Sequence, residues 1–323
     1  MIEILLKEWI ERVKYYIHLI ADYSIKESQV GAVLDDVLNL SGKMLRSKLL
    51  LLCAFLGSNW KDNKEKICKL AAMVELTHLA SLIHDDIVDD SPYRRGKVSI
   101  QGKYGKDAAV FAGDFLIARI FYYGAVENLN EAVSILSKTV EYMCIGEIEQ
   151  DLCRYQEDIS EKKYFENIER KTAALFQAAS YIGAKETGCS EEIIQKLKLF
   201  VKNLGLMFQL KDDILDFTSN SKELGKETHK DFQNGIYTFP VIMALKNPKA
   251  REVLLPIMRK NKEEKLSLTE ILQLQSYIIQ FGGIEASYEK IKYLSTINRQ
   301  LIKELGQNSK ITVYLEKILN DLE

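Results

Sequence analysis

The feature that most constrains the fold is a scarcity of helix breakers in a chain whose apolar residues have helical spacing. The 323 residues include only four prolines, namely Pro92, Pro240, Pro248 and Pro256. Proline removes a backbone donor and clashes inside a helix, so long stretches without it are free to be helical. Apolar residues recur three and four positions apart, as in Leu5, Trp9, Val13, Tyr16, Ile17 and Ile20, whereas strand-like alternation is scarce. We therefore predict an all-α fold.

We expect one helical domain over residues 1–323, because no long linker, low-complexity stretch or short-period repeat interrupts the pattern. A chain of this length can bury a large core. The expected helices span residues 2–23, 25–38, 44–57, 62–87, 106–128, 130–153, 161–187, 191–217, 231–246, 249–260, 267–280 and, in pieces, 283–321. Gly282 and Gly283 are expected at a bend between two of them.

Composition excludes several classes of function. A net charge of −2 provides no overall basic field for nucleic acid. The five cysteines are odd in number and show no CxxC spacing, which fits buried thiols in a reducing compartment better than disulfides or a zinc site. The N-terminal residues lack the layout of a signal peptide, and the longest apolar run, residues 49–56, is too short to span a bilayer. We expect a cytoplasmic protein without a transmembrane segment.

An apolar helical run ends in a block of carboxylates that includes Asp85, Asp86 and Asp89. Residues four apart lie on one face of a helix, so the side chains of Asp85 and Asp89 are neighbours. Two anions this close repel each other unless a cation lies between them. Magnesium is the natural candidate, since it prefers oxygen ligands and is usually held by one or two carboxylates together with substrate phosphates. A solvated helix end is the alternative for one such block alone.

The same DDxxD pattern recurs at Asp212, Asp213 and Asp216, again after an apolar helical run. Because the two acidic helix faces share one design, we predict that they point toward each other and hold a cluster of metal ions. Each block is followed by cations, Arg94 and Arg95 in one case and Lys222, Lys226 and Lys230 in the other. Arg and Lys suit phosphate oxygens, although a surface ion-pair network is the alternative. Carboxylates for metals and cations for phosphates together predict a polyphosphate pocket.

These blocks belong to a longer series of motifs between Gly42 and Pro240. In chain order they are Gly42-Lys43-x-x-Arg46, Glu75-x-x-His78, His84-Asp85-Asp86-x-x-Asp89, Arg94-Arg95-Gly96-Lys97, Gly146-Glu147-x-x-Gln150, Lys171-Thr172, Phe208-Gln209, Asp212-Asp213-x-x-Asp216, Gly225-Lys226, Asp231 and Gly235-x-x-Thr238-x-Pro240. The series closely resembles the trans-isoprenyl diphosphate synthase family, the head-to-tail prenyltransferases. The full series in order is specific, whereas either DDxxD alone is not.

The resemblance implies a bundle of antiparallel helices around a deep central cavity, of the isoprenoid synthase type and usually a homodimer. It also implies the reaction. An allylic diphosphate loses diphosphate, and the double bond of isopentenyl diphosphate attacks the resulting carbocation. Loss of a proton then gives an allylic diphosphate five carbons longer, and the released diphosphate is the implied proton acceptor, so we nominate no protein base.

The resemblance also assigns roles to the charged residues. The implied primary magnesium ligands are Asp85, Asp89 and Asp212, with Asp86, Asp213 and Asp216 in support and three Mg²⁺ ions bound with substrate. The implied ligands of the allylic diphosphate are Arg94, Lys171 and Lys226. The implied ligands of isopentenyl diphosphate are Lys43, Arg46, His78 and Arg95. Metal ions would stabilise the charge that develops on the leaving diphosphate, whereas the uncleaved diphosphate only needs an anchor.

Lys171, Thr172 and Gln209 are similar to family residues whose carbonyl and amide oxygens face the allylic cation and act in catalysis. Oxygen dipoles can stabilise such a cation without capturing it. As alternatives, Thr172 and Gln209 could be ordinary helix residues, and His78 a hydrogen-bonded core histidine.

Product length should depend on the helix that leads into the first motif. One helical turn rises about 5.4 Å, so Ala80 and Ser81, one turn before Asp85, would meet the growing chain first. Both are small, whereas short-chain members of the family typically place an aromatic residue there. We therefore expect a medium- to long-chain product, about C30 to C40, such as a quinone side-chain precursor. A floor could be formed further down by Met73, Thr77, Phe115 or Tyr122.

Several alternatives stay open on sequence alone. The enzyme could be a geranylgeranyl or farnesyl diphosphate synthase, or the catalytic subunit of a heteromeric synthase that is inactive without a regulatory partner. A catalytically silent regulatory or structural subunit of such a synthase would usually lack these aspartates. A terpene cyclase would share the first motif but usually carries an Asn/Ser/Glu metal motif second. A purely structural helical protein would leave the two sets of acids unexplained.

Overall fold

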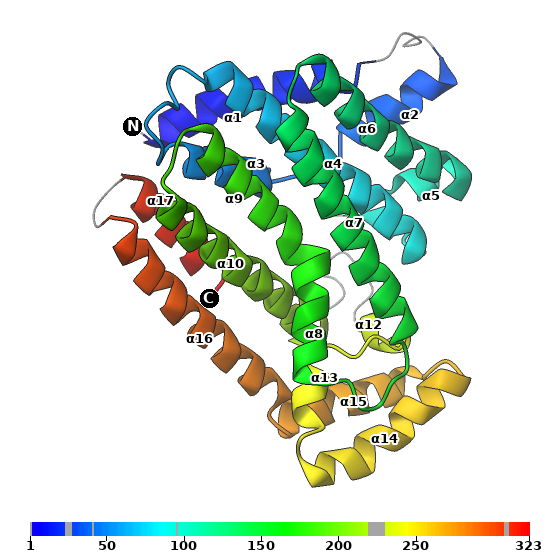
Figure 1. Cartoon of the computed structure of the whole chain (residues 1–323). Helices are drawn as coiled ribbons and strands as arrows, with labels where there is room; N and C mark the ends of the chain where they lie inside the picture. Colours follow the sequence, from blue (N-terminus) through cyan, green and yellow to red (C-terminus); the bar gives the residue numbers. More distant parts are fainter. Residues whose placement is uncertain (1, 23–27, 41, 95, 219–229, 307–309) are drawn as a thin grey trace. The chain divides into compact units, whose positions relative to one another are not determined.

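The structure is a computed structural model that describes residues 2–22, 28–40, 42–94, 96–218, 230–306 and 310–323. Apart from one short hairpin, its regular elements are helices, which run from the blue α1 to the red α17 in Figure 1. The all-α prediction is confirmed. Two residues with predicted roles, Arg95 and Lys226, lie outside the described residues, as does Lys222.

The chain divides into two compact units. Unit 1 comprises Met1–Val140, Leu175–Leu199 and Asn308–Val313, and unit 2 comprises Glu141–Ala174, Phe200–Gln307 and Tyr314–Glu323. The prediction of a single domain stays a prediction.

Unit 1 is built around one buried helix, α4 (Lys64–Val88), which packs against α1 (Ile2–Ile20), α3 (Leu45–Ala54) and α6 (Lys106–Val126). Its remaining elements are α2 (Gln29–Leu38), β1 (Tyr93–Arg94), β2 (Lys97–Val98), α5 (Ile100–Tyr104), the start of α7 (Asn130–Leu152), α9 (Ala174–Glu186) from residue 175 on, and the start of α10 (Glu191–Thr218). The two strands pair antiparallel. Buried side chains point from all sides of α4, as expected of a helix enclosed by others.

Two described helices, α4 and α6, are long and apolar enough to cross a membrane by length and composition alone. The apolar window of α4 is 72% buried, which is typical of a core helix in a folded protein. That of α6 is 39% buried, so much of this apolar helix faces outward in unit 1.

Unit 2 contains the ends of α7 and α10, α8 (Glu161–Ile168), the π-helical segment η1 (Glu169–Ala173), α12 (Lys230–Gln233), α13 (Phe239–Ala244), α14 (Pro248–Glu263), α15 (Leu268–Gln280), α16 (Gly283–Glu304) and most of α17 (Lys310–Asn320). A core cluster includes Phe217, Phe232, Val241, Leu254 and Leu274. A buried amide pair joins α10 to α16. The Nδ2 of Asn203 donates to the Oδ1 of Asn298 over 3.0 Å, and the Nδ2 of Asn298 donates to the carbonyl of Phe200 over 3.0 Å.

The structure differs from the sequence prediction in three places. The hairpin and α5 follow the first acidic motif where no element was expected. The helix predicted over 231–246 was wrong as one element, because the chain turns at Gly235, with φ +75°, and restarts at α13 with Pro240 in its first turn. The helix predicted over 161–187 is continuous in extent but contains η1. Gly282, with φ +77°, separates α15 from α16 as expected.

Candidate active site

The first acidic motif lies at the C-terminal end of α4, and its middle carboxylate is buried. Asp86 is 2% exposed, whereas Asp85 and Asp89 are partly exposed. The Nε of Arg94, on β1, donates to the Oδ1 of Asp86 over 2.7 Å. The side-chain amide of Gln101, on α5, donates to the Asp86 carbonyl over 2.6 Å. The hairpin and α5 therefore fix the end of α4, and the outer carboxylates project from a helix end held in place.

Arg94 was predicted to bind the allylic diphosphate, and here its guanidinium is engaged by Asp86. The side chain of Arg94 is 16% exposed and that of Asp86 is 3% exposed. An ion pair this buried persists only because each charge compensates the other. A guanidinium has five donors, so engagement of its Nε leaves donors available to a phosphate.

A second group of predicted residues meets where α3 packs against α4. The Nη1 of Arg46 lies 2.9 Å from the Nε2 of His78. The guanidinium of Arg46 lies 4.5 Å from the ring centroid of Phe176, a cation–π contact that fixes its plane. Beside it, the Oγ of Ser47 donates to the buried Glu75 carboxylate over 2.9 Å. The structure thus brings Arg46 and His78 together in unit 1.

Lys43 is exposed just before α3. The next residue, Met44, has φ +51°, a left-handed conformation that is uncommon for residues other than glycine. Met44 is nonetheless 4% exposed, so packing of its side chain holds the strained backbone.

The second acidic motif lies near the end of α10 and repeats the design of the first. Asp213 is 1% exposed, whereas Asp212 is exposed and Asp216 partly exposed. The hydroxyl of Tyr164 donates to the Oδ2 of Asp213 over 2.5 Å, and the Nε2 of Gln209 donates to its Oδ1 over 2.9 Å. Both motifs therefore have a buried, hydrogen-bonded middle aspartate.

Burial decides the protonation of this group. Removal from water raises the pKa of Asp213 to about 8, while the hydrogen bonds from Tyr164 and Gln209 oppose that rise by stabilising the ionised form. Burial, and then the negative charge of Asp213, raises the pKa of Tyr164 well above its usual value. The tyrosine is therefore a neutral hydrogen-bond donor.

Lys171 and Thr172 lie on η1, a wide helical turn enclosed by two glycines. A Cβ on Gly205, in α10, would lie 2.8 Å from the Cα of Ala173, and one on Gly146, in α7, would lie 3.0 Å from the Lys171 nitrogen. π-Turns inside α-helices occur frequently at functional sites. From this turn the hydroxyl of Thr172 donates to the Oε1 of Gln209 over 2.9 Å.

Carboxylates on α7 engage the cations around η1. The Nζ of Lys171 lies 3.0 Å from the Glu147 carboxylate. Glu149 accepts from Lys163 at 3.0 Å and Arg170 at 2.5 Å, and these two bonds lower the pKa of Glu149. Lys171, one of the cations predicted to bind the allylic diphosphate, is therefore already paired with a side chain in this structure.

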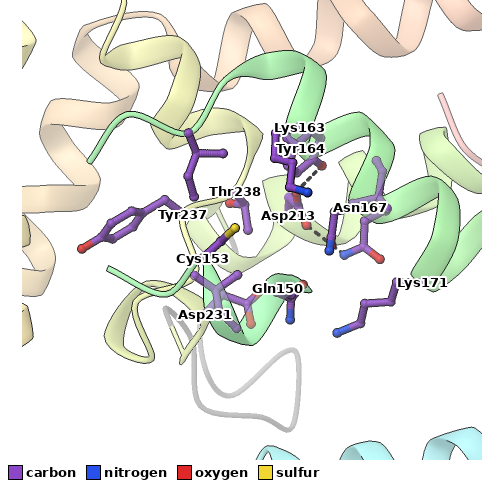
Figure 2. Close-up of a pocket in the computed structure, with 14 residues that line it drawn as sticks. Gln150, Cys153, Lys163, Tyr164, Asn167, Lys171, Asp213, Asp231, Tyr237 and Thr238 are labelled. Carbon is purple, nitrogen blue, oxygen red and sulfur yellow. Dashed lines mark hydrogen bonds between the residues drawn. The ribbon is translucent and has the colours of Figure 1, made fainter. Parts of the chain in front are cut away.

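A cavity of about 80 Å³ opens beside the second motif within unit 2, and its lining residues are drawn in Figure 2. Its polar wall includes Lys171, Gln209, Asp213 and Asp231, and its apolar wall includes Ile159, Ile168 and Ile236. Figure 2 shows Tyr164 and Asn167 reaching from α8 toward Asp213 and Lys171. The cavity connects the buried carboxylate with the lysine and glutamine that the sequence assigns to the allylic substrate.

Some residues of this site were not singled out from the sequence. Tyr164 binds Asp213, and the Nδ2 of Asn167 donates to the Gly146 carbonyl over 2.7 Å. Gly205 provides the close approach to η1. An isolated glycine inside a long helix costs stability and suggests a packing reason, so Gly205 carried a recognisable signal. Nothing in the pattern around Tyr164 distinguished it from a core aromatic residue.

The proposed gate residues lie on α4, where Ala80 is fully buried and the Ser81 hydroxyl donates to the His78 carbonyl over 2.8 Å. Of the candidates for a floor, Met73 and Thr77 are buried and Phe115 is partly exposed. Tyr122 is 61% exposed in unit 1.

Comparison with known proteins identifies what this chain resembles. A family profile described as polyprenyl synthetase matches residues 27–275. Component 2 of heptaprenyl diphosphate synthase from Geobacillus stearothermophilus is 34% identical over 265 residues, covering 81% of this chain and 80% of the relative.

Two solved structures extend the comparison to the fold. A polyprenyl synthase from Caulobacter crescentus CB15, complexed with calcium and isoprenyl diphosphate, superposes with a TM-score of 0.88 at 30% identity, covering 98% of this chain and 95% of that one. A decaprenyl diphosphate synthase from Rhodobacter capsulatus gives a TM-score of 0.86 at 27% identity, covering 98% and 96%.

The contact at Gly205 yields a prediction. Gly205→Ala improves helix propensity by about 1 kcal/mol, but its methyl group would overlap the Ala173 backbone, and such overpacking costs about 1–3 kcal/mol. We expect lower stability, with a midpoint of thermal unfolding a few degrees below that of the wild type. Leu199→Ala, on an exposed position of the same helix, is the control. A Gly205→Ala protein with an unchanged or raised midpoint would refute the close approach.

Proposed function

Because the chain belongs to the polyprenyl synthetase family, we propose that it condenses isopentenyl diphosphate head to tail with an allylic diphosphate to give an all-trans polyprenyl diphosphate of about C30 to C40. The general activity follows from family membership: the chain is a polyprenyl diphosphate synthase, a prenyltransferase. The observation that carries the proposed metal-dependent condensation is the shared design of the two acidic motifs, each with its middle aspartate buried and its outer aspartates more accessible.

The outer aspartates fit magnesium. Among the described residues, no three His, Cys, Asp or Glu side chains are grouped so as to hold a metal by themselves. That arrangement suits Mg²⁺, which is typically bound by one or two carboxylates together with substrate phosphates. We assign Asp85, Asp89 and Asp212 to this role, with Asp86, Asp213 and Asp216 in support. Bound magnesium would neutralise the charge that develops on the departing diphosphate.

The two diphosphates need different partners. Arg46 and His78, already in contact on α3 and α4, would anchor the diphosphate of isopentenyl diphosphate together with Lys43. Lys171 and Arg94 would bind the allylic diphosphate by exchanging part of their contacts with Glu147 and Asp86 for phosphate oxygens. Arg95 and Lys226 complete the two sets by resemblance.

The allylic cation needs oxygen dipoles rather than a nucleophile. The Thr172 hydroxyl and the Gln209 amide lie 2.9 Å apart beside Lys171. Their oxygens can stabilise a positive charge without forming a bond to it. We propose that this pair, with the Lys171 carbonyl, lines the path of the cation.

Product length and partners follow from the relatives by analogy. The Geobacillus relative is named for a heptaprenyl product, which falls within the proposed range. Its designation as component 2 favours a second possibility, that this chain is the catalytic subunit of a heteromeric enzyme. Phe111, Tyr122 and Val126 form an exposed apolar face on α6, and we assign that face to a second copy in a homodimer.

Activity is tested by incubating the purified chain with Mg²⁺, isopentenyl diphosphate and allylic primers of several lengths. We expect Mg²⁺-dependent elongation, and a fall of about a thousandfold or more in Asp85→Ala combined with Asp212→Ala, because the leaving group loses its metal. Asp90→Ala, an exposed neighbour of the first motif, should retain activity. An equally active double variant would exclude the proposed chemistry.

The same purified protein is used to test the oligomeric state and the need for a second subunit. Light scattering should give about twice the 37.0 kDa of one chain. A single-chain mass would contradict the homodimer. A chain that is inactive alone but active after addition of the regulatory component of a related synthase would be the catalytic half of a heteromer.

The length of the polyprenyl product is tested by substitutions on α4. Replacing Ala80 and Ser81 by phenylalanine should shorten the product, because the aromatic rings would fill the space one helical turn before Asp85. Mass spectrometry of the products measures the shift, and Val88→Phe, exposed at the end of the same helix, is the control. An unchanged product distribution in an active, folded variant would place the gate elsewhere.

A further inference from the structure

We propose that Tyr164 is a positioning residue that acts through Asp213 to fix the orientation of the Gln209 amide, and thereby the oxygen that faces the allylic cation. The inference rests on the proposed function. In unit 2, two hydrogen bonds join Tyr164, Asp213 and Gln209 in series, and a third joins Gln209 to Thr172.

The ring of Tyr164 is held by aromatic contacts. Tyr164 is 7% exposed on α8, with its ring centroid 5.1 Å from that of Phe165 and 5.4 Å from that of Phe239. These contacts leave the ring little freedom, so its hydroxyl is directed at the Oδ2 of Asp213. Figure 2 shows the dashed bond between the two side chains.

The carboxylate then determines which end of the Gln209 amide it meets. Both oxygens of the Asp213 side chain accept a hydrogen bond in this structure, one from Tyr164 and one from Gln209. Because Oδ2 binds Tyr164, the Oδ1 of Asp213 faces Gln209, one turn earlier on α10, and accepts from its Nε2. The reversed amide would lose the bond that Gln209 donates to Oδ1 and the bond that it accepts from Thr172.

The other end of the amide is thereby directed at η1. The Oε1 of Gln209 accepts from the Thr172 hydroxyl beside Lys171. An amide carbonyl has two lone pairs, so one remains for a developing positive charge. Loss of the Tyr164 hydroxyl would free the Asp213 carboxylate to rotate, and the amide would no longer have one preferred direction.

Tyr164→Phe tests this role because it removes the hydroxyl and keeps the ring. We expect kcat to fall about tenfold or more with the KM for isopentenyl diphosphate unchanged, since that substrate is anchored elsewhere. Tyr237→Phe is the matched control: it lies on the same cavity, and its hydroxyl contacts the Met258 carbonyl at 3.5 Å rather than Asp213. Tyr237→Phe should stay within about twofold of the wild type.

A double-mutant comparison separates positioning from general stability. In a Gln209→Met background, Tyr164→Phe should cause little further loss of kcat, because the group it positions is gone. Equal losses of kcat in both backgrounds, or a lower unfolding midpoint with unchanged kcat, would overturn the proposal. If Tyr164→Phe does not fold, Phe239→Leu replaces it, because it loosens the packing of the Tyr164 ring and keeps the hydroxyl. The same dependence on Gln209 is expected.

The result also distinguishes this proposal from the proposed function. A wild-type protein that elongates none of the allylic primers, alone or with the regulatory component of a related synthase, would refute the function itself. An active wild type whose Tyr164→Phe variant keeps the wild-type kcat would refute only the positioning role.

Discussion

The site depends on the burial of one carboxylate in the middle of each acidic motif. A buried carboxyl group is costly unless it is paired or hydrogen-bonded, so Asp86 and Asp213 each need partners in their surroundings. Asp86 engages Arg94 on the hairpin, and Asp213 engages Tyr164 on α8 and Gln209 on α10. Because these anchors hold the ends of α4 and α10, the outer aspartates of each motif project from fixed helix ends. The anchoring residue and the proposed metal-binding residues are thus neighbours on one helix.

Close packing around η1 also determines where the proposed catalytic side chains lie. Gly146 and Gly205 allow two helices to approach a wide helical turn, and that turn places Thr172 against Gln209. Gln209 in turn binds Asp213. A change of one methyl group at Gly205 therefore reaches the proposed cation-stabilising oxygens through backbone packing, without touching the site directly.

Sequence reasoning predicted most helices and located both motifs, because helical periodicity and DDxxD spacing are local signals. It failed where the cause is tertiary. The helix predicted over 231–246 breaks at Gly235, where a side chain would lie 2.7 Å from the ring of Tyr155, and that contact comes from a distant segment. The motif around Arg94 and the Lys171-Thr172 pair predicted anion binding but not their present partners, Asp86 and Glu147. Tyr164 was missed because only the fold brings it to Asp213.

The central claim is that the middle aspartate of each motif anchors a helix end and the outer aspartates bind metal. Its most direct test is thermal unfolding measured with and without magnesium pyrophosphate. Asp85→Asn should unfold at the wild-type midpoint without ligand and lose most of the upward shift that ligand binding confers. Asp86→Asn should lower the ligand-free midpoint by several degrees, because Arg94 loses its buried counter-charge. A ligand-free midpoint for Asp86→Asn equal to that of the wild type, together with a full ligand-induced shift in Asp85→Asn, would contradict the account.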